Sequence, residues 1–80
     1  MYWILYRAFD AFGILLYVGI THDFERRKAE HRTKSPWYSH RVRFRTETFE
    51  SFHLAEVMER LVIRSEGPMF NVAHNIGVSL

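Results

Sequence analysis

The sequence predicts an α/β (α+β) fold in which a small central antiparallel sheet of three strands is flanked by helices, in the order β-β-α-β-α. Three observations lead to this prediction: two apolar runs joined by a turn signal, a third run that alternates strictly, and two segments that begin with helix-capping residues. A chain of 80 residues buries only roughly 60–65% of its unfolded surface. We therefore expect one domain, spanning residues 1–80, with a thin core.

The first two strands are predicted at residues 2–9 and 14–21, which are almost continuously apolar. Asp10-Ala11-Phe12-Gly13 lies between them and contains the Asp and Gly that a tight turn favours, so the pair is typical of an antiparallel hairpin. A symmetric loop of two or four residues places Tyr6 directly opposite Tyr17, with Cβ atoms about 5 Å apart. Two adjacent phenols can perform acid–base chemistry, although tyrosines in strands also simply pack.

A helix and a strand are predicted next along the chain. Asp23 can cap a helix that runs from residue 24 to about residue 32. Residues 41–45 alternate strictly between charged and apolar side chains. This alternation predicts a third strand, with Val42 and Phe44 turned inward and the three arginines outward.

The second helix has clear signals at both ends. Ser51 can cap it, and it runs from residue 52 to about residue 65, where Gly67-Pro68 ends it. Apolar residues at helical spacing predict the stripe that faces the core, namely Leu54, Val57, Met58, Leu61 and Val62. Residues 69–80 are predicted to form a loop and tail.

The composition excludes several classes of protein. The chain has no cysteine, so neither disulfides nor a thiolate metal site can support the fold. No apolar run approaches the ~20 residues that a membrane helix needs, and the N-terminus lacks the pattern of a signal peptide. We therefore expect a cytoplasmic, intracellular protein with no membrane partner.

The net charge is +2, but the charge is distributed unevenly along the chain. Residues 26–45 contain eight basic residues and one acidic residue, whereas the rest of the chain contains three basic and eight acidic residues. A basic segment of this kind favours binding to a polyanion such as DNA, although an ordinary solvated face has the same composition. The candidate DNA-binding residues are Arg26, Lys28, Arg41, Arg43 and Arg45.

Three positions on the two predicted helices could carry chemistry beside the tyrosines. Arg27 and His31 are four residues apart and share a helix face, where the guanidinium could grip two phosphate oxygens. The alternative is an ordinary surface pair. Glu59 adjoins the apolar stripe of the second helix and could hold a hard cation such as Mg²⁺. The alternative is a half-buried glutamate paired with Arg60 or Arg64.

The ordered set of these motifs resembles the GIY-YIG nuclease family over residues 4–72. Ile4-Leu5-Tyr6 and Tyr17-Val18-Gly19 occupy the places of the two name-giving tripeptides, and Ile4 replaces the first glycine. The arginine and histidine of residues 25–31, the helix around Glu59 and the segment Pro68-x-x-Asn71 follow in the family's order.

The resemblance implies a metal-dependent endonuclease that hydrolyses DNA phosphodiester bonds. It implies that the catalytic residues are Tyr6, Tyr17, Arg27, His31 and Glu59, with Asn71 and His40 in supporting positions. Glu59 would hold one Mg²⁺ or Mn²⁺ ion. Tyr17 would be the leading candidate to take a proton from the attacking water, and Tyr6 and His31 would position or assist it.

Two other functions are compatible with the sequence. The chain could be a catalytically inactive DNA-binding or targeting module, although it retains all five polar site residues. It could instead be a small interaction protein that uses its basic face to bind an acidic partner. In many members of the family a separate domain selects the DNA, so a separate DNA-targeting domain or protein is an expected partner.

Overall fold

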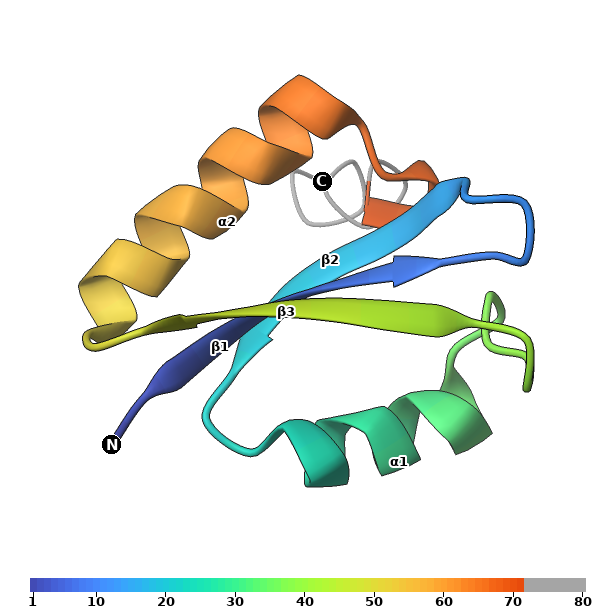
Figure 1. Cartoon of the computed structure of the whole chain (residues 1–80), viewed down its shortest axis with the longest axis horizontal. Coiled ribbons are helices and arrows are strands. Elements are labelled where there is room, and N and C mark those ends of the chain that lie inside the picture. Colours follow the sequence, from blue (N-terminus) through green and yellow to red (C-terminus); the bar gives the residue numbers. More distant parts are fainter. Residues whose placement is uncertain (72–80) are drawn as a thin grey trace, which may run out of the picture.

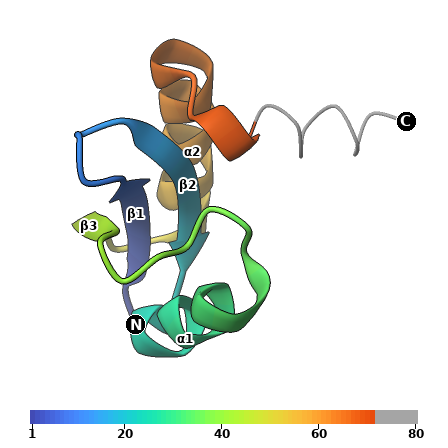
Figure 2. The same ribbon diagram turned by 90° about the vertical axis from the view of Figure 1, so that its right-hand side faces the viewer.

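The computed structural model describes residues 1–71, which contain β1 (Trp3–Phe9), β2 (Leu15–Thr21), α1 (Phe24–Lys34), β3 (Arg43–Phe49) and α2 (Phe52–Glu66). The strands form an antiparallel sheet in the order β2-β1-β3, so β1 is central and β2 and β3 are the edges. Helices α1 and α2 cover opposite faces of this sheet (Figure 1; Figure 2). The predicted fold class and element order are confirmed.

The turn between β1 and β2 is not the symmetric loop that was predicted. The Asp10 N–H donates a hydrogen bond to the Ile14 carbonyl (3.0 Å), so the loop consists of residues 11–13. Gly13 has a φ of 85°. Loops of three residues that end in a left-handed glycine are a common solution for hairpins. The Asp10 carboxylate also accepts the Ile14 N–H (2.9 Å), which stabilises this odd-numbered loop.

This turn and a bulge in β2 change the register of the hairpin. Tyr6 pairs with Gly19, and Tyr17 pairs with Ala8, so the prediction that Tyr6 and Tyr17 lie directly opposite each other was wrong. The pairing shifts at the end of β1, where Leu16 has no partner and forms the bulge. The two tyrosines are nevertheless diagonal neighbours, with ring centroids 6.2 Å apart.

Helix α1 begins as predicted, because the Asp23 side chain accepts the Arg26 N–H (3.2 Å). It ends two residues later than expected. Strand β3 also differs from the prediction, since it begins at residue 43 and continues to residue 49 along the whole of β1. The Val42 N–H is bound to the Ser39 carbonyl (3.0 Å), so residues 41 and 42 belong to a turn and not to the strand.

Helix α2 has the predicted cap, since the Ser51 side chain accepts the Leu54 N–H (3.1 Å). The predicted core stripe is only partly right. Leu54 and Leu61 are 53% and 50% exposed, and Val57 is exposed as well. The helix instead rests on the sheet through a face one residue further round, which comprises Ala55, Met58, Val62 and Ile63. Glu59 therefore lies within the packed side of the helix.

Arg7 determines which face of α2 meets the sheet. Its guanidinium donates two hydrogen bonds to the Glu66 carboxylate, both of 3.0 Å, and pairs with Glu47 on β3. Arg7 itself is only 7% exposed. Because a buried arginine must keep its partners, these ion pairs hold the C-terminal end of α2 against the centre of the sheet. They raise the pKa of Arg7 above its usual range.

Residues 69–71 are helical and not part of a loop, while the rest of the predicted tail, residues 72–80, lies outside the described residues. Neither α1 nor α2 has the length and apolar character of a membrane-spanning helix, and the same holds for the rest of residues 1–71.

Candidate active site

Tyr17 lies between two hollows at the β2 edge of the sheet. The first, here the α1 hollow, is lined on the α1 side by residues that include Arg27, His31, Lys34, Ser35 and Trp37. The second, the α2 hollow, is lined by residues that include Glu56, Glu59, Arg60, Arg64 and Asn71. Tyr17 lines both. The edge strand therefore brings residues from the two opposite helical layers to the same tyrosine.

Tyr6 lies on the same sheet face as Tyr17, but it is only 1% exposed. Its ring packs between Phe24 of α1 and Phe44 of β3, with centroids 5.6 and 6.3 Å away. Burial raises the pKa of Tyr6 above its ordinary value, and the neighbouring Tyr17 adds to this effect. Tyr6 is therefore a protonated phenol that a bound substrate cannot touch.

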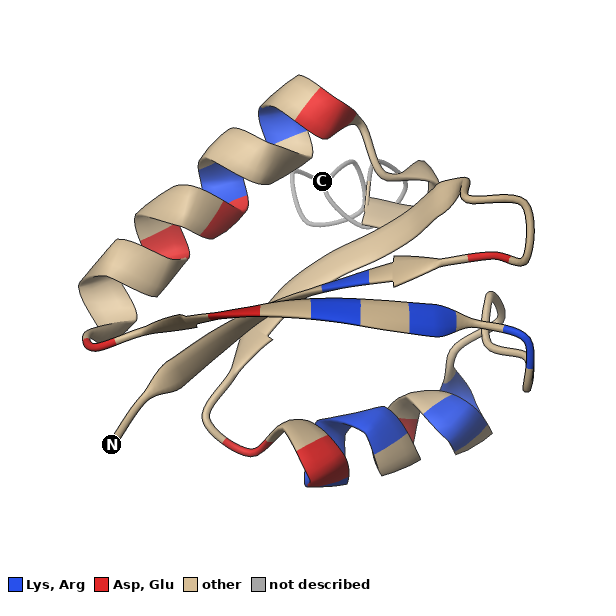
Figure 3. Ribbon diagram, viewed as in Figure 1, with Lys and Arg blue, Asp and Glu red and all other residues tan. Residues whose placement is uncertain are grey.

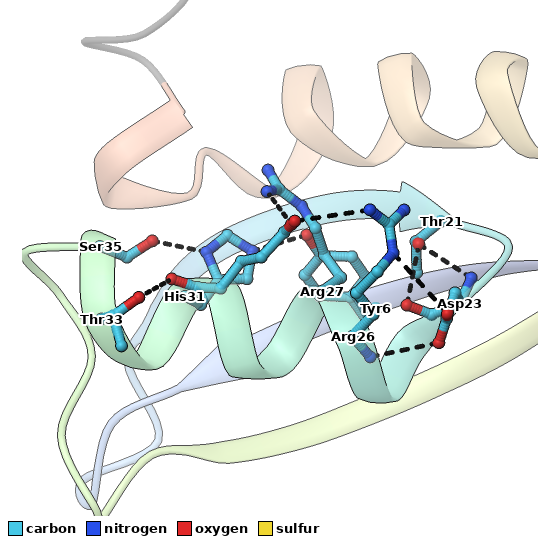
Figure 4. A network of polar contacts seen from close by, with 9 residues as sticks. Tyr6, Thr21, Asp23, Arg26, Arg27, His31, Thr33 and Ser35 are labelled. Atoms are coloured by element: carbon cyan, nitrogen blue, oxygen red, sulfur yellow. Dashed lines mark hydrogen bonds and ion pairs between the residues drawn. The ribbon is translucent and has the colours of Figure 1, made fainter.

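His31 joins Tyr6 to the end of α1 (Figure 4). The Tyr6 hydroxyl is 2.7 Å from His31 Nε2, and the Ser35 hydroxyl is 2.5 Å from His31 Nδ1. The imidazole is 4% exposed, so it is not the surface histidine of the alternative interpretation. Burial, together with the positive charge of Arg27, lowers the pKa of His31 to about 4. The imidazole is consequently neutral near pH 7.

Tyr17 is held by aromatic contacts. Its ring stacks on Trp37, with centroids 5.3 Å apart and an interplanar angle of 20°. It also makes an edge-to-face contact with the His31 ring, with centroids 5.1 Å apart. Trp37 is itself 8% exposed and packs against His31, with ring centroids 4.7 Å apart. Tyr17 remains half-buried, so its hydroxyl, unlike that of Tyr6, belongs to a surface that a substrate can reach.

Arg27 reaches the α1 hollow from the middle of α1, and its side chain is 38% exposed. It donates a hydrogen bond to the Glu30 carboxylate at 3.0 Å. The positive charge of Arg27 also acts on Tyr6, whose pKa it lowers against the larger effect of burial. Partial burial opposes the charge on Arg27, but Glu30 and the tyrosines outweigh burial and raise its pKa. The same contact lowers the pKa of Glu30. Arg27 thus keeps a fixed positive charge at the hollow.

Glu59 and Asn71 lie on the other side of Tyr17. Asn71 is 3% exposed and pairs with the free edge of β2, where its amide group accepts the Val18 N–H (2.7 Å) and donates to the Val18 carbonyl (2.9 Å). The Asn71 side chain therefore satisfies the backbone hydrogen bonds of Val18 that a neighbouring strand would otherwise satisfy, directly beside Tyr17. Glu59 is half-buried in the same hollow.

The residues of the α2 hollow fit a magnesium-type ion. Mg²⁺ is usually held by one or two carboxylates, with water and substrate phosphate as its other ligands, and does not need a cage of protein ligands. Glu59 supplies one such carboxylate, and Glu56 lines the same hollow. Within residues 1–71 there is no cluster of three or more histidine or acidic side chains that could hold a metal ion by itself.

The candidate DNA-binding residues lie further from Tyr17. On α1, Arg26 pairs with Asp23 and Glu30, and Lys28 pairs with Glu25. The basic residues of β3 lie on the sheet edge opposite β2 (Figure 3). Three predicted residues in this region are exposed, namely Arg41, Arg43 and Arg45. His40 is exposed in the connector before β3 and is not among the described residues that line the two hollows.

Several residues beside Tyr17 were given no site role from the sequence. Ser35 and Trp37 enclose His31, and Arg60 and Arg64 line the α2 hollow. The spacing of Arg60 and Arg64 is a detectable signal, because two arginines four residues apart share a helix face. The contacts of Ser35 and Trp37 have no comparable signal, since they depend on how the chain turns after α1.

The family model for the GIY-YIG catalytic domain matches residues 2–70 of the chain. This segment includes Tyr6, Tyr17, Arg27, His31 and Glu59. Neither the curated proteins nor the solved structures include a match to the chain.

Proposed function

Because this chain belongs to the GIY-YIG catalytic domain family, a family of endonucleases, we propose that it hydrolyses DNA phosphodiester bonds with the help of Mg²⁺ or Mn²⁺. The observation that supports this most strongly is the position of Tyr17 between the α1 hollow and the α2 hollow. A phosphate placed against Tyr17 meets the guanidinium of Arg27 on one side and the carboxylate of Glu59 on the other.

The two tyrosines have different roles in this proposal. Tyr17 is half-buried and lines both hollows, so it can contact the attacking water and accept its proton. A phenol has an ordinary pKa of about 10, and it therefore needs nearby positive charge to act as a base near neutral pH. Arg27 provides such a charge. Tyr6 is too deeply buried to contact DNA, and it positions His31 instead.

Glu59 would hold the metal ion, and Glu56, which pairs with Arg60 (3.6 Å), is a second carboxylate in the same hollow. When bound there, the ion supplies positive charge that stabilises the phosphate oxygens as negative charge develops on them. Arg27 binds the same phosphate from the α1 side. A planar guanidinium suits this task because it can donate two parallel hydrogen bonds to phosphate oxygens.

The DNA would cross the β2 edge, with basic residues on both sides of the bond to be cut. Lys34 lies beside Arg27 in the α1 hollow, and Arg60 and Arg64 lie in the α2 hollow. Arg26 and Lys28 extend the positive surface along α1. The β3 arginines at positions 41, 43 and 45 lie at the other edge, so we assign them to DNA that extends beyond the site.

Nicking of supercoiled plasmid DNA tests the proposed function. The protein should nick the plasmid in Mg²⁺ and should not do so in EDTA. Glu59→Gln keeps the shape of the side chain but removes the charge that holds the cation, so it should abolish cleavage and keep the fold.

Glu50→Gln is the matched control, because Glu50 is exposed just before α2 and lies outside both hollows. It should cleave like the wild type. Equal turnover by Glu59→Gln and the wild type at saturating Mg²⁺ would remove Glu59 from the site. DNA binding without cleavage in any metal would instead identify an inactive binding module.

A further inference from the structure

Ser35 contacts His31 twice at the end of α1. Its backbone N–H donates to the His31 carbonyl at 3.0 Å, and its hydroxyl oxygen lies 2.5 Å from His31 Nδ1. The two contacts place Ser35 against His31 at the end of α1 (Figure 4), and both residues line the α1 hollow.

Pro36 explains why Ser35 adopts this position. A residue before proline is disfavoured in the helical conformation, because the proline ring would clash with its backbone. Ser35 accordingly leaves the helix with φ −92° and ψ 128°. In this extended conformation its short side chain reaches back by one turn to His31. Trp37 then folds against the other side of the imidazole, with ring centroids 4.7 Å apart.

The neutral imidazole can donate only one of its two hydrogen bonds. If Nε2 carried the proton, it would donate to the Tyr6 oxygen. The Tyr6 O–H would then need another acceptor, although Tyr6 is only 1% exposed. A buried donor without a partner is destabilising. If Nδ1 carries the proton, every group is satisfied.

We propose that Ser35 is a positioning residue that holds His31 in its Nδ1–H tautomer and thereby orients the Tyr6 hydroxyl toward Nε2. The hydrogen bonds then run in one direction. Tyr6 donates to His31 Nε2, and His31 Nδ1–H donates to Ser35. Ser35 thus acts on the Tyr6 hydroxyl through the imidazole of His31. Only the consequence for cleavage rests on the proposed nuclease function.

The nitrogen NMR spectrum of the histidine rings tests the tautomer in the full chain, without DNA or metal. At pH 7 wild-type His31 should show a protonated Nδ1 and an unprotonated Nε2. Ser35→Thr keeps the hydroxyl and should preserve this pattern. Ser35→Ala and Ser35→Cys remove or weaken the acceptor, so both should shift His31 toward the Nε2–H form. Two such variants keep the test decisive if one of them does not fold.

Single-turnover cleavage gives the second measurement. Ser35→Ala should cut about 10-fold more slowly at saturating DNA, which is the rate equivalent of losing about one hydrogen bond. Its DNA affinity should stay unchanged, and Ser35→Thr should recover the rate. An Nε2–H tautomer in the wild type, or a His31 spectrum that is unchanged in Ser35→Ala and Ser35→Cys, would overturn the proposal. Absence of cleavage by the wild type would overturn the proposed function and leave the tautomer result valid.

Discussion

Gly19 lies directly opposite Tyr6 and leaves the space that the phenol occupies. A Cβ atom at position 19 would stand 2.5 Å from the Tyr6 hydroxyl oxygen and 2.6 Å from Cζ. Such distances are far below normal contact, so any side chain here would displace the phenol. The glycine of Tyr17-Val18-Gly19 is therefore required by packing, whatever the chemistry of the site.

Gly19→Ala should destabilise the protein by about 1–3 kcal/mol, the usual cost of overfilling a packed core. The Tyr6 ring cannot move aside easily, because Phe24, Phe44 and His31 surround it. Urea denaturation measures the effect. In the double variant with Tyr6→Phe the two losses should not add, because both changes act on the same contact. Full additivity, or a Gly19→Ala protein as stable as the wild type, would contradict this packing.

Stability should fall between pH 6.5 and pH 4 because of His31. The ordinary pKa of histidine is about 6.5, and burial lowers the pKa of His31 to about 4 in the folded chain. Between these values the unfolded chain binds a proton that the folded chain does not, so acid favours unfolding. The stabilisation is complete above pH 6.5 and is lost as the pH falls toward 4.

Urea denaturation at pH 7.5 and pH 5 tests this dependence. The wild type and His31→Gln share the other histidines, so the difference between the two proteins reports the protonation of His31 alone. The wild type should lose more free energy of unfolding than the variant between the two pH values. An equal loss in both proteins would show that His31 titrates normally in the folded state.

DNA affinity should depend steeply on salt, with a log–log slope of about −0.9 for each phosphate that the protein neutralises. Lys34→Ala and Arg64→Ala remove charges beside the two hollows, so each should reduce the size of this slope by about one. A salt-independent affinity would count against DNA as the partner.

Duplexes of two lengths can distinguish DNA contacts of the β3 arginines from DNA contacts at the site. The protein is 29 Å across, which corresponds to about 9 base pairs at 3.4 Å each. Arg43→Ala and Arg45→Ala should leave the salt slope unchanged on a duplex of about 8 base pairs and reduce it on one of about 24. No change on the longer duplex would remove the β3 arginines from the DNA-binding surface.

The parts of the fold that could be predicted from the sequence are those with local signals. The Asp23 and Ser51 caps gave the starts of both helices, because capping depends on a few neighbouring residues. The hairpin register could not be obtained in this way. It depends on the odd loop that ends in Gly13 and on the bulge at Leu16, and an extra residue in either place shifts every pair before it.

The prediction of which face of α2 packs on the sheet was partly wrong for a related reason. Two overlapping stripes on this helix have helical spacing, and tertiary contacts choose between them. The small side chain of Ala55 is buried and allows the helix to pack closely on the sheet, and Arg7 on the central strand forms an ion pair with Glu66. Candidate site residues that belong to a family motif, such as Tyr17 and Glu59, could be proposed from the sequence. Ser35 could not, because its role depends on contact with a buried imidazole.

The most direct test of the central claim is the single-turnover cleavage rate of Tyr17→Phe at saturating DNA and Mg²⁺, compared with Tyr6→Phe. Tyr17→Phe should cleave roughly 10²–10⁴-fold more slowly, the usual loss when an acid–base group is removed. Tyr6→Phe should lose less, because Tyr6 is buried and only positions its neighbours. DNA affinity in Ca²⁺ should be unchanged in both variants, since a proton-transfer group acts in the transition state. Cleavage by Tyr17→Phe at the wild-type rate would contradict the account and show that Tyr17 only packs against Trp37.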